Sequence, residues 1–154
     1  MIRVLWPGKT KNWELRRLIE TYRQRIEKMI TFELVETREA RGLGDEATEM
    51  TKIKEAGYLK KLLKDDYVVC LSDRGKEMSS IEFAHWLQRK LATNSRPLTF
   101  IIGGYAGLAD EIMARANELL SLSRMTFSHE LCRLLLLEQI YRSLTQMKGW
   151  PYAK

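Results

Sequence analysis

Residues 98–108 read LTFIIGGYAGL, and this stretch decides how the rest of the chain is interpreted. The apolar run 98–103 predicts a buried strand, and the glycines at 103, 104 and 107 predict a tight turn. The segment ADEIMARANELL then predicts a helix that runs to about Leu120. A strand, a glycine-rich turn and a helix in this order hold phosphates and nucleotides in many proteins, so the turn is a candidate binding site.

The turn does not match a dinucleotide fingerprint, which needs G-x-G-x-x-G and an acidic residue about 20 residues further on. Gly104 and Gly107 have the required spacing, but Ile102 stands where the first glycine belongs, and SLSRMTF follows downstream without a carboxylate. Two interpretations stay open. One is an ordinary strand-to-helix turn; the other is a pocket whose backbone N–H and C=O groups approach a flat ligand closely. In the second, a side chain at Gly104 is expected to fill the pocket.

Strands and helices alternate on both sides of this turn. Asn12 and the pair Ser79 and Glu82 are predicted to cap the first and third helices. Strands are predicted over 2–8, 31–37, 67–71 and 98–103, and helices over 13–29, 48–64, 80–93 and 130–147, with a loop at 38–47. The continuous apolar run YVVCL (67–71) is typical of a strand buried on both faces of a parallel sheet. We therefore expect one α/β domain over residues 1–154, with a mainly parallel sheet and helices on both faces. In the second helix, Met50, Ile53, Ala56 and Leu63 are expected to face inward.

Composition narrows the function classes. The net charge is +6, and residues 1–64 carry 15 Lys and Arg against 10 Asp and Glu. This excess suits a polyanion such as RNA, and it equally suits an ordinary solvated surface. No run of about 18 apolar residues predicts a membrane span, and no signal peptide is recognisable. Cys70 and Cys132 lack a metal-ligand spacing, so we expect buried thiols in a reducing cytoplasm and no metal site.

Three segments carry a resemblance to a known family: FIIGGYAGL (100–108), LSLSRMTFSHELCRLLLLEQIYR (120–142) and GWPYAK (149–154). Together they resemble the ribosomal RNA large subunit methyltransferase H family. Its members are minimal SPOUT methyltransferases that modify N3 of a pseudouridine in 23S rRNA. The resemblance extends from IRVLWPGK through LSDRGKEMSSIEFA to the last residue.

The resemblance implies a C-terminal segment threaded into a deep trefoil knot, a rare exception to unknotted topology. It also implies that S-adenosylmethionine lies against three loops, with no metal because the sulfonium already activates its methyl group. Carried over to this chain, the three loops give the cofactor residues Leu71 with the turn to Gly75, then Gly103, Gly104 and Gly107, then Leu122, Ser123, Arg124, Met125, Thr126 and Phe127.

The last predicted helix indicates a partner. LLLL at 134–137 places leucine around a full helical turn, which is more than one buried face of a monomer accommodates. The alternative is a central core helix within one subunit. The resemblance implies homodimerisation through this helix, a composite active site and 23S rRNA within the assembled ribosome as the substrate.

Methylation of N3 needs the ring to lose a proton, so a base or an anion-stabilising cation would help. His129 is a candidate base or a structural cap, and Arg142 either holds the substrate or pairs with Glu138. Arg133, one turn from His129, is expected to face an RNA channel. Tyr152 is available for stacking on a base, and Lys154 for a phosphate.

The tail departs from the family, whose members typically end in Pro-Tyr-His and a basic residue. This chain has Ala153 in place of the histidine. A catalytically silent RNA-binding dimer and an enzyme for another RNA therefore remain alternatives.

Overall fold

The computed structural model describes residues 1–40 and 48–152, so residues 41–47 of the predicted loop and the last two residues of the tail lie outside it. Within these described ranges, ten elements alternate. They are β1 (Ile2–Pro7), α1 (Trp13–Glu27), β2 (Phe32–Thr37), α2 (Thr48–Leu62), β3 (Tyr67–Glu77), α3 (Ser80–Thr93), β4 (Leu98–Ile101), α4 (Asp110–Arg115), β5 (Glu118–Ser121) and α5 (His129–Met147).

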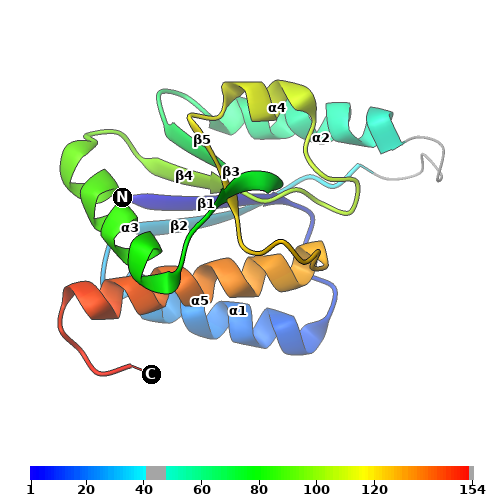
Figure 1. Ribbon diagram of the computed structural model, residues 1–154. Coiled ribbons are helices and arrows are strands. Elements are labelled where there is room, and N and C mark those ends of the chain that lie inside the picture. The colour runs from blue at the N-terminus through cyan, green and yellow to red at the C-terminus, as the bar shows by residue number, and fades with distance from the viewer. Residues whose placement is uncertain (41–47, 153–154) are drawn as a thin grey trace.

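The five strands form one sheet in the order β2-β1-β4-β3-β5, and all four neighbouring pairs are parallel. Helices α1, α3 and α5 cover one face of the sheet, and α2 and α4 cover the other (Figure 1). The predicted parallel α/β fold is confirmed. Because all strands run the same way, their carboxyl ends meet at one edge of the sheet.

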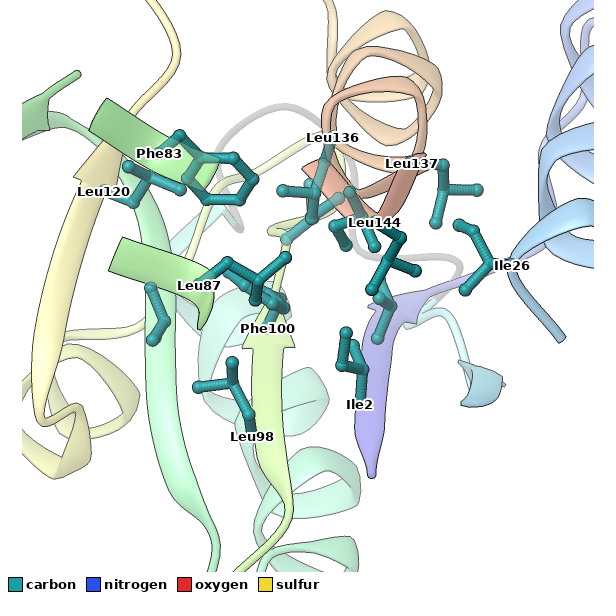
Figure 2. Packing of buried hydrophobic residues seen from close by; sticks show 14 of the residues in the cluster. Ile2, Ile26, Phe83, Leu87, Leu98, Phe100, Leu120, Leu136, Leu137 and Leu144 are labelled. Carbon is teal, nitrogen blue, oxygen red and sulfur yellow. The ribbon is translucent and has the colours of Figure 1, made fainter. Parts of the chain in front are cut away.

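The core lies on both faces of the sheet, and alternate strand residues belong to its two halves. Val4 and Val69 pack in the larger cluster, while Leu5, Val68 and Cys70 pack in the smaller one with α2 and α4. Figure 2 shows part of the larger cluster, in which Leu136, Leu137 and Leu144 of α5 face Ile26 of α1, strand residues and α3. Continuous apolar runs are thus required in the central strands, as the sequence predicts.

Local sequence signals set several helix starts. The Asn12 side chain accepts a hydrogen bond from the Leu15 N–H at 3.0 Å. Ser79 and Glu82 form the predicted capping box, with bonds of 3.2 and 2.7 Å. Both predicted caps are confirmed.

The predicted inner face of α2 is wrong at two positions. Met50 and Ile53 are 55% and 63% exposed, whereas Glu55, Ala56 and Leu59 are buried. The helix is rotated so that Ala56 and Leu59 pack against the sheet with Ile112 of α4.

The predicted helix up to Leu120 is also wrong, because α4 ends at Arg115 and Glu118–Ser121 form the edge strand β5. Asn117, directly before this strand, forms two hydrogen bonds with the Val68 backbone, both at 2.8 Å. Its N–H donates to the Val68 carbonyl, and its side-chain oxygen accepts from the Val68 N–H. Glu118 then accepts a hydrogen bond from the Trp86 indole at 3.0 Å and forms an ion pair with Lys90 at 2.5 Å. These tertiary contacts select a strand where local propensity favoured a helix.

Strand β3 lies unusually close to β5. Leu71 and Lys76 both pair with Leu120, so the residues between them form a bulge. A Cβ atom on Gly75 would stand 2.5 Å from the Leu120 carbonyl carbon. Only glycine permits this approach of the two backbones.

Within the described residues, no helix has both the length and the hydropathy needed to cross a membrane.

Candidate functional site

A cavity of about 380 Å³ opens at the carboxyl edge of the sheet. Its walls come from the middle of β3, the segment after β4, the end of β5 with the loop that follows it, and the first turn of α5. We call it the main cavity. In open parallel sheets, ligands bind at this edge.

Most of the predicted cofactor residues line the main cavity. They are Leu71, Gly103, Gly104, Gly107, Leu122, Ser123, Met125, Thr126 and Phe127. Gly75 and Arg124 are not among its lining residues. The contact with Leu120 described above explains Gly75, which shapes the cavity indirectly by letting β3 lie against β5.

The glycine turn is held in a conformation that side chains do not permit. Gly107 has a φ of +83°, in the left-handed region, and its N–H donates to the Gly104 carbonyl at 3.0 Å. A Cβ on Gly103 would lie 2.8 Å from the carbonyl carbon of Gly107. The turn therefore presents backbone, not side chains, to the cavity.

The expectation that a side chain at Gly104 would fill the pocket is wrong for its first atom. Its Cβ would meet Glu55 Oε2 at 3.2 Å and Pro7 Cβ at 3.5 Å, and neither residue lines the main cavity. A larger residue at this position would press on Glu55 first.

The loop after β5 is shaped by its own hydroxyl groups. Ser121 Oγ donates to the Ser123 carbonyl at 2.9 Å, and Ser123 Oγ accepts from the Met125 N–H at 3.0 Å. Leu122 and Phe127 are half-buried and, with Leu71 of β3, give the cavity apolar walls. The cavity thus combines flat apolar surfaces with backbone and hydroxyl groups, as a heterocycle with a polar edge requires.

His129 lies at the first position of α5 and lines the main cavity. Burial, and to a smaller extent the Arg133 guanidinium, lower its pKa. The imidazole is therefore neutral at pH 7 and can accept a proton.

Arg133 does not face an RNA channel, because its side chain is buried under the loop after β1. Its guanidinium donates to the Pro7 carbonyl at 2.7 Å and to Thr10 Oγ1 at 3.0 Å, and it lies 4.9 Å from the centre of the Trp6 ring. Burial lowers the pKa of Arg133. The residue is structural: it fixes the β1–α1 loop to the start of α5.

Glu55 contacts the glycine turn on the side away from the main cavity, and it is only 3% exposed. Its Oε1 accepts from the Ala40 N–H at 3.3 Å, while Oε2 has no hydrogen-bond partner among the described residues. Burial raises the pKa of this carboxyl group, although Arg133 opposes the shift.

Arg142 and Tyr152 do not reach the main cavity. Arg142 pairs with Glu138 at 2.7 Å, as the alternative interpretation predicts, and its guanidinium lies 4.9 Å from the centre of the Tyr152 ring. The Tyr152 hydroxyl is 2.9 Å from that of Tyr22 in α1. Arg142 stands thirteen positions after His129 in α5, roughly 20 Å along the axis.

Other lining residues were not predicted. Tyr105 and Leu108 belong to the glycine turn, whereas Ser121 ends β5 and Cys132 lies in α5. Local patterns do not indicate that these three stretches of the chain reach the same space. Ser121 was the accessible one, because it opens the hydroxyl-bearing run SLSRMTF that was expected to form the second loop.

Comparison with known proteins decides the family. Residues 1–153 match the family described as "Predicted SPOUT methyltransferase". The chain belongs to this SPOUT methyltransferase family. A SPOUT relative from Geotalea daltonii, named ribosomal RNA large subunit methyltransferase H, is 41% identical over 152 residues, which is 98% of this chain and 97% of the relative. A protein of the same name from Bacteroides thetaiotaomicron is 38% identical over 97% of this chain and 96% of its own length.

Solved structures support the SPOUT fold. A probable methyltransferase from Bordetella pertussis Tohama I superposes with a TM-score of 0.57 at 13% identity, covering 93% of both chains. A probable methylase family protein from Haemophilus influenzae gives a TM-score of 0.55 at 14% identity, covering 99% of this chain and 70% of that protein. At these identities the likeness concerns the fold alone.

Proposed function

We propose that this chain transfers a methyl group from S-adenosylmethionine to large-subunit ribosomal RNA, at N3 of a pseudouridine in 23S rRNA. The observation that carries the proposal is the main cavity. Three segments far apart in the sequence meet there, and nine of the eleven predicted cofactor residues line it.

The residues present suit S-adenosylmethionine. A cavity of about 380 Å³ lies within the range of roughly 300–1,000 Å³ that is usual for small-molecule sites. Leu71, Leu122 and Phe127 would hold the flat adenine, whose polar edge is read by backbone groups of the glycine turn and of the following loop. The bound cofactor supplies an electrophilic methyl group, so the protein needs only to orient it and to prepare the acceptor.

His129 is the chain's own candidate for preparing the acceptor. It opens onto the main cavity, and its lowered pKa keeps the imidazole neutral at pH 7. A neutral imidazole can accept the N3 proton of a bound base.

A homodimer would complete the site. Arg142 lies too far along α5 to reach the cavity of its own chain, and Tyr152, in the tail after α5, is not among the cavity-lining residues, so a second copy must bring them there if they act on the acceptor. Leu136 and Leu137 are fully buried within the subunit, while Leu134 and Leu135 stay only half-buried. Leu135 lines a neighbouring hollow of about 250 Å³. We propose that these leucines contact the second copy.

Three further points belong to this proposal. The positive charge of residues 1–64 suits rRNA, and we propose that recognition occurs within the assembled ribosome.

The close approach of β3 to β5 at Gly75 is compatible with a C-terminal trefoil knot. A protein that modifies this substrate would act in the cytoplasm.

Calorimetric titration with S-adenosylmethionine tests the cofactor assignment. We expect saturable binding with one molecule per subunit. S-adenosylhomocysteine should compete because it shares the adenosine and the amino acid, and ATP should not. Equal competition by ATP, or no heat of binding at all, would contradict the assignment.

Ala153 favours a second candidate, a silent RNA-binding dimer. If an imidazole at this position prepares the acceptor, Ala153→His should raise single-turnover methyl transfer at least tenfold, a barrier change of about 1.4 kcal/mol. Cofactor affinity should stay the same, because the predicted cofactor loops lie elsewhere in the sequence. A chain that stays inactive with either residue, while binding RNA, would support the silent alternative.

A further inference from the structure

An exposed tryptophan stands at the start of α1. Trp13 is 61% exposed, whereas Trp6 and Trp86 are buried in the core. The guanidinium of Arg17, one helical turn later, lies 5.6 Å from the centre of the Trp13 ring. An exposed indole beside a guanidinium offers a flat face on which another ring can stack.

The sequence around Trp13 is basic, and the folded chain brings the carboxylates of Glu130 and Glu39 against Lys11. Residues 9–17 hold four Lys and Arg against one acidic residue, Glu14. Lys9, Lys11 and Arg17 are exposed. Arg16 instead binds within the protein, because its Nε donates to the Thr10 carbonyl at 2.8 Å. We call Lys9, Lys11, Trp13 and Arg17 the α1 patch.

The α1 patch is fixed beside the main cavity. The Glu130 carboxylate accepts the Lys11 N–H at 3.0 Å and the Asn12 N–H at 2.9 Å. Glu130 directly follows His129, which lines the cavity. Helices α1 and α5 also begin at the same edge of the sheet (Figure 1). A ligand that extends out of the cavity past His129 would therefore meet the patch.

We propose that Trp13 and Arg17 form a stacking platform for an unpaired base of single-stranded RNA, with Lys9 and Lys11 facing its phosphates. The inference rests on the proposed function only in taking RNA as the substrate. Every base has a flat face that stacks on an indole, and the bases of a duplex are not available for this contact. The patch would hold nucleotides that flank the target while the target enters the cavity.

Fluorescence anisotropy tests the platform. The probes are a labelled 12-nucleotide single-stranded RNA of mixed sequence and the same RNA annealed to its complement. Trp13→Ala should weaken binding of the single strand by roughly tenfold or more. Trp13→Phe, which keeps an aromatic face, should recover most of the affinity. Duplex binding should change little in either variant.

Ile81→Ala is the matched control, because Ile81 is 62% exposed on α3 and residues 79–83 around it hold no Lys or Arg. It should leave both affinities unchanged. Calorimetry with S-adenosylmethionine should give the same affinity for Trp13→Ala as for the parent chain. A parent chain that binds the single strand but not the cofactor would refute the proposed function and leave the platform standing.

Three results would overturn the platform. The first is equal single-strand affinity in Trp13→Ala and the parent chain, and the second is a parent chain that binds neither RNA. The third is a Trp13→Ala chain that sediments as a smaller species than the parent, because Trp13 would then serve a protein contact.

Discussion

Glu55 places a buried carboxyl group against the turn that shapes the main cavity. Its pKa is raised from 4.5 chiefly by burial, so the folded state holds the proton more tightly than the unfolded chain does. The stabilisation is complete below the ordinary pKa and is lost as the pH rises from that value through the raised one.

Glu55→Gln removes this titration. Relative to the parent, the variant should therefore gain thermal stability as the pH rises from about 4 to about 8. Scanning calorimetry across this range measures the difference. Glu49→Gln, an exposed change in the same helix, controls for the loss of one carboxylate from α2. Parallel curves for Glu55→Gln and its parent would contradict the raised pKa.

Substitution of Gly107 tests whether the cofactor turn must present backbone groups, and not a side chain, to the main cavity. Its φ of +83° disfavours any side chain, at a cost of about 1–2 kcal/mol. Gly107→Ala should distort the turn and weaken S-adenosylmethionine binding by roughly tenfold. Gly149→Ala carries similar strain at a φ of +65°, but it lies at the far end of α5. Calorimetric affinities that fall equally in both variants would show a loss of stability and not a local effect.

At the scale of elements, the fold depends on the contact between β3 and β5. A methyl group added at Gly75 would overlap the Leu120 backbone, with a separation of 2.5 Å. We expect Gly75→Ala to lower the free energy of unfolding by about 1–3 kcal/mol and to weaken cofactor binding with it. Urea denaturation measures the first effect.

Gly57→Ala is the control for that experiment, because nothing lies within 4 Å of a Cβ at this helical position. It should raise stability by about 0.5–1 kcal/mol through helix propensity. If Gly75→Ala behaves like Gly57→Ala, the close approach of β3 and β5 is not essential.

The elements that sequence predicts well are those with local causes. Asn12, Ser79 and Glu82 cap helices through contacts within three residues, and YVVCL is apolar enough to show a buried strand. Strand β5 is only four residues long and depends on Trp86 and Lys90, more than 25 residues earlier in the chain. The four residues ELLS show no periodicity that would indicate these contacts.

The site residues likewise divide into those with a local cause in the sequence and those that depend on distant contacts. The glycine turn is visible in the sequence because positive φ and close backbone approach require glycine. The resemblance supplied the other cofactor loops. The burial of Arg133 depends on Pro7 and Thr10, more than 120 residues away, so its position could not be predicted from the spacing of α5.

At the scale of the whole molecule, a composite site makes a prediction that a monomer does not share. The parent should sediment as a dimer of 18.1 kDa subunits at micromolar concentration. A chain with Gly107→Ala has a distorted cofactor turn, and one with Arg142→Ala lacks the distal arginine. Mixed after partial unfolding and refolding together, they should recover methyl transfer, because each hybrid dimer contains one intact cavity facing one intact Arg142. No recovery, or a monomer by sedimentation, would contradict the composite site.

The most direct test of the central claim is transfer of a tritiated methyl group from S-adenosylmethionine. The acceptors are assembled ribosomes, separate subunits and naked rRNA, all from cells that lack this modification. The account predicts label in 23S rRNA of assembled ribosomes, at N3 of a pseudouridine, and less label from Gly107→Ala when the cofactor concentration is limiting. Cofactor binding without label in any of the three acceptors, by the parent and by Ala153→His alike, would contradict it.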